Sequence, residues 1–166
     1  MKGRILQAAT IFLLIFSLCA CSLSEKGSSL FGFSERMDKL CENIDFTAEG
    51  FLYSQEENGY IKYFESENAV ILMKLMCNEK QKITTMHIVF DGLSEKNTAE
   101  IKFIKNLIIS FVDNPETSAQ IINDEDFYKD IFQESTQTKM KKFGSIDLLI
   151  DTTEVGTVIT LVQNIP

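Results

Sequence analysis

The stretch from residue 69 to residue 90 constrains the fold more than any other part of the chain. It contains two runs of strand-forming residues, 69–77 and 83–90, joined by a polar segment. With a loop at 79–82, an antiparallel hairpin pairs Ile71 with Phe90, Met73 with Ile88, Leu75 with Met86, Lys74 with His87, and Cys77 with Thr84. One face of the hairpin is then apolar and the other amphipathic, because side chains alternate between the faces of a strand. The pattern predicts a sheet with one face against the hydrophobic core.

Helices are predicted on both sides of this hairpin. Apolar residues at helical spacing indicate helices at about 35–46, with Ser34 as the N-cap, and at 97–112. Asn97 and Glu100 have the spacing of a capping box at the start of the second helix. Two shorter helices are expected to follow Asn114-Pro115 and Asp124.

Further strands complete the expected fold. They are predicted at 51–53, 60–64, 146–150 and 158–162. The order is then α-β-β-β-β-α-α-α-β-β, which is typical of an α+β protein. We expect a single, mostly antiparallel sheet of five or six strands with helices packed on one face.

The N-terminal segment has the composition of a secretory signal. Lys2 and Arg4 precede an apolar run at 5–18. A helix of about fourteen residues is roughly 21 Å long, which is short for a hydrocarbon core of about 30 Å. A positive head, a short apolar run and a small-residue exit are typical of a cleaved signal rather than of a permanent membrane span.

The exit from this run is Leu18-Cys19-Ala20-Cys21. It resembles the lipobox of bacterial lipoproteins, in which an aliphatic residue and two small residues precede a cysteine. The resemblance implies that residues 1–20 are removed as a signal peptide and that the Cys21 thiol receives a diacylglyceryl group. Two acyl chains make a stable membrane anchor, whereas one is marginal. The alternative is an ordinary signal cut after Ala20 without lipidation.

The expected organisation is a short tether followed by one domain. Residues 21–33 are rich in Ser, Gly and charged residues and predict a flexible tether from the lipid, and residues 34–166 suit a single domain. The anchored chain would lie on the extracytoplasmic face of the cell membrane. The bias towards Ile, Lys, Asn and Phe favours a Gram-positive source, and Ser22 would direct the protein to the outer membrane of a two-membrane cell.

The chain is acidic, with a net charge of −8 that becomes more negative once Lys2 and Arg4 leave with the signal. Nucleic-acid binding requires clustered Lys and Arg, so nucleic acid is not an expected partner. An acidic surface also disfavours lying flat on anionic lipid. The charge is mainly expected to keep the domain soluble.

Two cysteines remain in the expected domain, Cys41 and Cys77. An exported compartment permits a disulfide between them. The alternative, which we favour, is two buried free thiols, because Cys41 lies on the apolar side of its predicted helix.

His87 is the only histidine of the chain. Zinc sites with two histidines are therefore impossible, and a Ser-His-Asp or Cys-His pair would have to use this residue. The predicted register places His87 opposite Lys74 and on the other face from Cys77, which indicates a half-exposed surface residue. No nucleotide-binding glycine motif is present, and we expect no cofactor, metal or catalytic residue.

The acidic clusters do not define a cation site. Asp124-Glu125-Asp126 fits the start of a helix, and Asp147 and Asp151 fall on one solvent face of a strand; neither group has EF-hand spacing. A hydrolase with a pair of distant carboxylates remains as an alternative function.

The sequence thus favours a lipid-anchored, non-catalytic module that binds a protein or another envelope component. The alternative is a small cell-envelope hydrolase that uses scattered carboxylates. The candidate contact residues lie on the first predicted hairpin, formed by 51–53 and 60–64, and on the amphipathic face of the second, namely Tyr53, Tyr60, Tyr63, Lys74, Met76 and His87. For the tyrosines of the first hairpin we favour packing in the core, with a protein-contact patch as the alternative.

Overall fold

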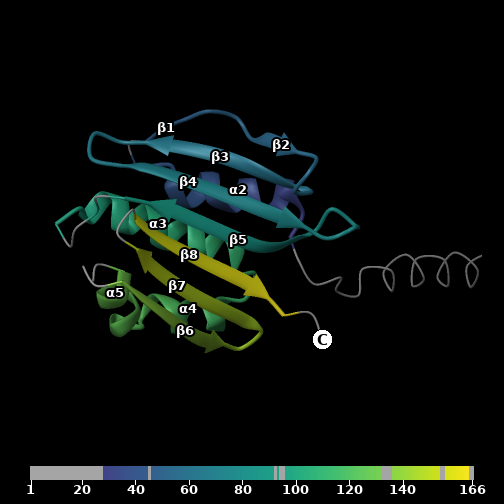
Figure 1. Cartoon of the computed structure of the whole chain (residues 1–166). Coiled ribbons are helices and arrows are strands. Elements are labelled where there is room, and N and C mark those ends of the chain that lie inside the picture. The colour runs from purple at the N-terminus through teal and green to yellow at the C-terminus, as the bar shows by residue number, and fades with distance from the viewer. Residues whose placement is uncertain are drawn as a thin grey trace, which may run out of the picture.

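A computed structural model describes residues 28–44, 46–91, 93, 96–131, 136–153 and 156–164. The predicted signal peptide, Cys21 and the first residues of the predicted tether lie outside this part of the chain. The described residues form one eight-stranded sheet with four helices (Figure 1).

The sheet is antiparallel at every neighbouring pair and has the strand order β1-β3-β4-β5-β8-β7-β6, with β2 also paired to β3. The strands are β1 Thr47–Ala48, β2 Leu52–Ser54, β3 Gly59–Glu65, β4 Val70–Cys77, β5 Ile83–Phe90, β6 Gln137–Phe143, β7 Ile146–Thr153 and β8 Gly156–Gln163. The central pair β5 and β8 joins an N-terminal half of the sheet to a C-terminal half.

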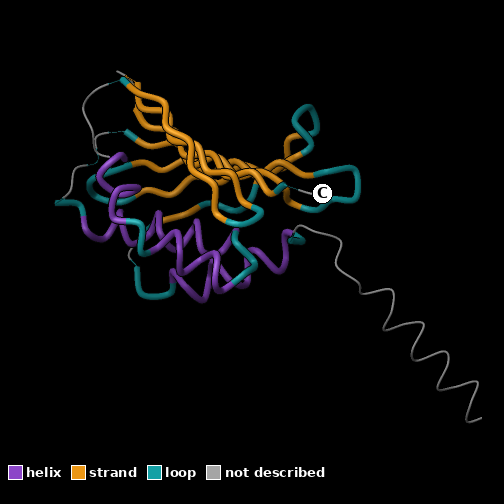
Figure 2. The backbone as a smooth tube through the Cα atoms, turned by 90° about the horizontal axis from the view of Figure 1, so that it is seen from below, coloured by secondary structure: helices purple, strands orange, loops and turns teal. Residues whose placement is uncertain are grey.

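The helices are α2 Leu30–Cys41, α3 Thr98–Phe111, α4 Pro115–Ile122 and α5 Glu125–Ile131. They lie together on one side of the sheet, as Figure 2 shows. The core fills the space between the two layers and includes Phe33, Ile71, Leu75, Phe103, Leu107, Phe127, Leu148 and Leu161. The opposite side of the sheet has no helix against it in the described part of the chain.

The predicted number of strands was wrong, because the sheet has eight strands rather than five or six. The two strands that the prediction lacks are β1, which is only two residues long, and β6. Strand β6 carries three lysines in seven residues, so its sequence lacks the apolar alternation from which the other strands are predicted. It is an edge strand, where charged side chains are common because they discourage pairing with other chains.

The predicted bounds of the first helix were also wrong. Helix α2 begins at Leu30, after the N-cap Ser29, whose Oγ accepts a hydrogen bond from Gly32 N over 3.2 Å. Phe33 and Met37 are its buried residues, and the helix ends at Cys41. Residues 30–33, which we predicted to be tether, therefore belong to the domain. The backbone of Ser28 even bridges to β5 at Ile83.

Helix α3 begins after Asn97 as predicted, but the predicted capping box does not form. The Asn97 side chain makes no capping hydrogen bond. The Glu100 carboxylate is only 3% exposed and accepts hydrogen bonds from Ser66 Oγ (2.9 Å) and Asn68 Nδ2 (3.0 Å) in the turn between β3 and β4. Desolvation by itself raises the pKa of Glu100, but the hydrogen bonds outweigh it and lower the pKa below its ordinary value. Glu100 therefore fastens the helix layer to the sheet as a carboxylate.

The central hairpin has the predicted register over most of its length. Ile71 pairs with Phe90, Met73 with Ile88, Lys74 with His87, and Leu75 with Met86. The register shifts between Met76 and Cys77, so that Cys77 pairs with Ile83 and not with Thr84. The shift places a bulge next to the turn, where Gln81 has a φ of 59° and the Asn78 side chain accepts hydrogen bonds from Lys80 N and Lys82 N.

The two short helices have the predicted caps. Asn114 caps α4 through a hydrogen bond from Thr117 N to its Oδ1 over 2.9 Å, with Pro115 at N1. Asp124 caps α5 in the same way through Phe127 N at 2.8 Å. The Asp124 carboxylate also binds Lys141 Nζ of β6 at 2.7 Å, so the cap of α5 is tied to the edge of the sheet.

Candidate functional site

The side of the sheet that faces away from the helices has no helix packed against it among the described residues. We call it the helix-free face. Its side chains follow from the strand register and form three parallel rows across the sheet. They are Tyr63, Leu72, Val89, Val158, Asp151 and Thr138; Ile61, Lys74, His87, Thr160, Leu149 and Met140; and Met76, Thr85, Val162, Asp147 and Lys142.

Apolar side chains dominate the helix-free face. Nine of the residues in the rows above are aliphatic, aromatic or methionine: Tyr63, Leu72, Val89, Val158, Ile61, Leu149, Met140, Met76 and Val162. Met140 on β6 is 66% exposed, and at the other edge of the sheet Tyr63 is 45% exposed and the nearby Val70 on β4 is 57% exposed. Large contiguous apolar patches are rare on monomeric proteins and mark interaction surfaces.

The structure divides the predicted contact residues between the two faces of the sheet. Tyr63, Lys74, Met76 and His87 lie on the helix-free face. Tyr60 pairs with Leu75 and Tyr53 pairs with Tyr60, so both point to the helix side. The two groups therefore do not form one surface. The split follows from the side-chain alternation of β3, whose register the sequence alone left uncertain.

Tyr53 and Tyr60 instead stabilise the edge of the core. Their ring centroids are 5.2 Å apart, and Tyr60 makes an edge contact with Phe51. Lys62 Nζ lies 4.7 Å from the centre of the Phe51 ring. The Tyr53 hydroxyl donates to Asn58 Oδ1 over 3.2 Å in the turn that joins β2 to β3. This cluster is mainly structural, although Tyr53 remains 52% exposed.

Lys74, His87 and Thr160 form the polar centre of the helix-free face. Lys74 pairs with Glu57 at the end of the first hairpin, and His87 Nδ1 lies 2.9 Å from Thr160 Oγ1. Burial lowers the pKa of His87 below 6.5, and the Lys74 charge lowers it further, while Glu57 acts in the opposite direction. His87 is therefore mainly neutral at neutral pH, and Lys74 is the principal cation of this region.

The second half of the face carries the acidic groups Asp147 and Asp151 on β7. Asp151 Oδ1 accepts from Thr138 Oγ1 over 2.8 Å, and Asp147 Oδ2 accepts from Asn164 Nδ2 over 2.6 Å. Four residues along a strand correspond to about 13 Å, which exceeds the spacing of glycosidase carboxylate pairs, about 5–9.5 Å. Across the described residues, no group of three or more His, Cys, Asp and Glu side chains could hold a metal ion.

The described residues line two hollows, one beside the helix-free face and one on the helix layer. The first, about 490 Å³, is at the β1 edge and contains two exposed carboxylates, Glu49 and Glu65, beside Tyr63 and Val70. The second, about 480 Å³, is an open apolar groove between α2, α3 and α4 with Arg36 at its rim. The carboxylates of the first hollow are exposed to solvent, so they lack the desolvation on which the acids of glycosidases depend.

The two cysteines of the domain are free thiols in the structure, as we favoured. Both are partly buried. Burial, with a smaller contribution from the Asp38 charge, raises the pKa of the Cys41 thiol to about 11. Burial also raises the pKa of Cys77. Such thiols stay protonated at neutral pH and are poor nucleophiles, so neither thiol is poised for catalysis.

Comparison with known proteins does not extend this picture. Scans against protein-family models, curated proteins and solved structures each found no match. No helix in the described ranges is both long and apolar enough to cross a membrane.

Sequence reasoning found only half of the helix-free face. It missed Met140, Leu149, Val158, Thr160 and Asp151, which β6, β7 and β8 place on the same surface as Lys74 and His87. A usable signal was present in β8, where Val158, Thr160 and Val162 alternate with the buried residues Ile159 and Leu161. What the sequence lacked was the pairing of β5 with β8, a contact between segments some seventy residues apart.

Proposed function

We propose that this protein is a lipid-anchored binding module of the bacterial cell surface whose helix-free face binds a protein partner. The single observation that carries the proposal is the composition of that face, with nine apolar side chains around one central cation on a sheet whose described helices all lie on the other side. Burial of such a surface against a partner would contribute about 25 cal/mol for each Å² of apolar area removed from water.

The anchor is proposed from the sequence. Diacylglyceryl transfer to Cys21, followed by removal of residues 1–20, would attach the domain to the extracytoplasmic face of the membrane. The described part of the domain begins at residue 28. We propose that residues 21–27 act as the tether to the lipid, with an average reach of roughly 15 Å. This short distance keeps the domain close to the membrane and favours a partner in the same envelope layer.

Binding is favoured over hydrolysis by the geometry of the carboxylates. Asp147 and Asp151 are too far apart for a glycosidase pair, and the carboxylates of the hollow at the β1 edge are exposed. His87 makes its closest polar contact with Thr160 and not with a cysteine or a carboxylate. We therefore propose no catalytic residue.

Two tyrosines offer a matched test of the binding face. Tyr63 on the helix-free face is 45% exposed, and Tyr53 on the other face is 52% exposed. A photoreactive phenylalanine analogue placed at either position keeps an aromatic ring there. We expect irradiation of intact cells to give a specific cross-linked product from position 63 and none from position 53. Equal cross-linking from both positions, or none from position 63, would contradict the proposed face.

The anchor has its own test. Replacement of Cys21 by Ala should abolish incorporation of labelled fatty acid and leave the uncleaved precursor. Replacement of Cys77 by Ala is the matched control, because Cys77 lies in the domain and should not affect lipid incorporation. If Cys21→Ala protein is still labelled and cleaved, the lipoprotein assignment fails while the binding face is unaffected.

A further inference from the structure

We propose that the partner seated on the helix-free face is a second copy of this chain, related to the first by a two-fold axis that runs parallel to the strands, between β5 and β8. The inference rests on the proposed binding function and adds the identity and orientation of the partner. Its basis is the arrangement of strands and charges across the face.

The six longer strands of the face are arranged symmetrically about the gap between β5 and β8. On one side lie β5, β4 and β3, with the short strands β1 and β2 paired to β3, and on the other side lie β8, β7 and β6. A two-fold axis parallel to the strands at this gap lays β5 of one copy over β8 of the other, β4 over β7, and β3 over β6. Each residue then faces its own row in the partner, as an isologous interface requires.

Charge complementarity selects this axis. Lys74 on β4 is placed over Leu149 on β7 of the second copy, and the register puts Asp147 and Asp151 one row away on either side. One row is about 7 Å along a strand, and packed sheets are about 10 Å apart, so the Lys74 side chain can reach either carboxylate. The symmetry forms this contact twice. The interface thus adds two opposite-charge contacts to the pairs that Lys74 forms with Glu57 and Asp147 forms with Lys142 within each copy.

An in-plane axis perpendicular to the strands brings like charges together instead. A two-fold axis perpendicular to the strands through the row of His87 would lay β4 over β4 and place Lys74 against Lys74 of the second copy. It would also bring Asp147 close to Asp151 of the second copy. Like charges in a desolvated interface cost several kcal/mol, so this arrangement is disfavoured.

The apolar contacts of the favoured arrangement match equally well. Val89 lies over Val158 of the second copy, and Ile61 lies over Met140. Tyr63 lies over Thr138, whose methyl group provides the apolar contact. Met140, the most exposed large apolar side chain of this face, is covered by an aliphatic one. Aligned sheet packing with interdigitated side chains is the usual geometry of two antiparallel sheets.

The face has the area that a stable dimer needs. Six strands spaced about 4.8 Å apart span roughly 29 Å, and seven or eight residues at about 3.4 Å each span roughly 25 Å. The flat area is therefore about 700 Å² for each copy, before the relief of the side chains is counted. Standard protein–protein interfaces bury about 800 Å² for each partner.

A zero-length cross-link reports the proposed contact directly. Carbodiimide joins an amine to a carboxylate only when they touch. Within one copy, Lys74 and Asp151 are three strand spacings apart, about 14 Å, which is too far for such a bond. We expect carbodiimide treatment of the lipoprotein in its own membranes to give a dimer that contains a peptide joining Lys74 to Asp151 or to Asp147.

Charge reversal distributed over two chains separates an interface effect from a folding defect. Lys74→Glu alone and Asp151→Lys alone should each reduce recovery of a differently tagged copy of the same variant by about tenfold or more. Co-expression of the Lys74→Glu chain with the Asp151→Lys chain should restore recovery, because both contacts of the mixed dimer again join opposite charges. Lys102→Glu on the exposed side of α3 is the control and should leave self-association unchanged.

The outcomes distinguish the two proposals. Rescue in the mixed pair supports the dimer, since a misfolded variant cannot be rescued by a second misfolded variant. Cross-links from the face to a different protein, or no self-association, overturn the second copy while the proposed binding function stands. Self-association that neither charge reversal reduces overturns the proposed axis. Absence of any cross-link from the face overturns both proposals.

Discussion

Lys74 lies directly opposite His87, on neighbouring strands at the centre of the helix-free face. Burial is the main cause of the lowered pKa of His87, and the ammonium group of Lys74 adds to it. Because His87 is the only histidine of the chain, its titration can be followed without overlap.

We predict that Lys74→Met raises the pKa of His87, because it removes the neighbouring positive charge. Glu57→Gln should lower the pKa further, since Glu57 acts in the opposite direction. Imidazole resonances recorded by NMR as a function of pH measure both changes. Identical titration curves in the wild type and in Lys74→Met would show that the two side chains do not interact in solution.

The same pKa shift predicts how stability depends on pH. The unfolded chain takes up a proton on His87 near its ordinary pKa of 6.5, whereas the folded chain does so only at lower pH. The free energy of unfolding should therefore fall as the pH drops below about 6.5, until the folded pKa is passed. His87→Gln should remove this part of the pH dependence. Urea denaturation at pH 7.5 and pH 5.5 provides the measurement, and an unchanged dependence in the variant would refute the assignment.

Glu100 is predicted to be the main carboxylate contact between the helix layer and the β3–β4 turn. Glu100→Ala removes two charge-assisted hydrogen bonds and should lower the free energy of unfolding by about 2 kcal/mol. Since its folded pKa lies below 4.5, the stabilisation is present at neutral pH and is lost as the pH falls below that value. Glu116→Ala, on an exposed position of α4, is the control. Equal losses for the two variants would contradict this role.

The ion pair of Lys139 with Asp130 should matter more than that of Lys129 with Asp126. The Asp130 side chain is 8% exposed, whereas Lys129 and Asp126 are 64% and 82% exposed. Lys139→Met leaves a buried carboxylate without its partner and should cost about 2 kcal/mol, reduced from the fully buried case because Lys139 is partly in water. Lys129→Met should change the free energy of unfolding by less than about 0.5 kcal/mol. Thermal unfolding of the two variants compares them, and similar melting temperatures would count against the pair.

Gly59 is required where β3 approaches β4. A methyl group on Gly59 would lie 2.1 Å from the backbone oxygen of Leu75. Gly59→Ala should therefore separate the two strands and cost about 2 kcal/mol or more. Gly50→Ala has no atom within 4 Å of the added methyl group and should be neutral. If the two variants denature at the same urea concentration, the close approach of β3 to β4 is absent in solution.

The sequence predicted the local parts of the fold better than its edges. Alternation within 69–90 identified the hairpin and the pairing of Lys74 with His87, because both strands are adjacent in the chain and one face is fully apolar. The start of α2 was missed because Ser34 and Ser29 are equally good caps and only the burial of Phe33 distinguishes them. The spacing of apolar residues along the chain does not show which of them are buried against another element.

Strand β6 and the second half of the candidate site were missed for a related reason. Lys139 and Lys141 are unusual on the helix side of a sheet until Asp130 and Asp124 supply their partners. These carboxylates belong to α5 and its cap, so the two lysines can be explained only once the position of the helices is known. The pairing of β5 with β8 likewise joins distant segments, and it is this pairing that completes the helix-free face.

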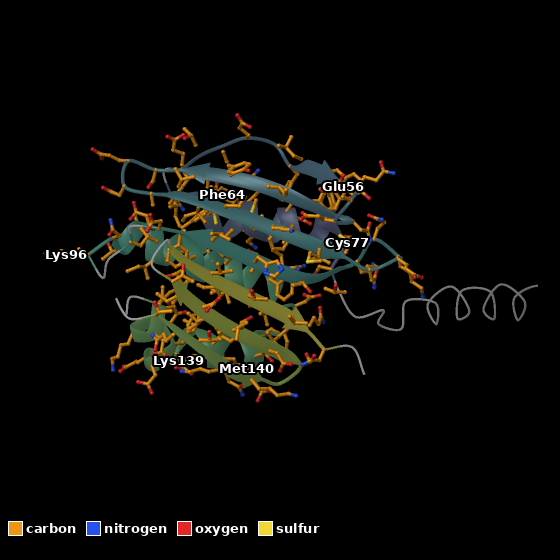
Figure 3. All side chains as sticks on the ribbon, viewed as in Figure 1. Glu56, Phe64, Cys77, Lys96, Lys139 and Met140 are labelled. Atoms are coloured by element: carbon orange, nitrogen blue, oxygen red, sulfur yellow. The ribbon has the colours of Figure 1, made fainter. Side chains whose placement is uncertain are left out.

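Figure 3 shows Met140 on β6 and Glu56 in the turn after β2, near opposite edges of the sheet. Met140 provides the most direct measurement of the central claim, because it is 66% exposed in the single copy and covered in the proposed dimer. Hydroxyl-radical oxidation can be measured on the lipoprotein in its membranes and again after dilution in detergent, with Tyr53 on the other face as the internal reference. We predict that Met140 is protected in the membrane and becomes reactive on dilution, while Tyr53 reacts equally in both. Equal oxidation of Met140 in the two states would contradict the claim that the helix-free face is a binding surface.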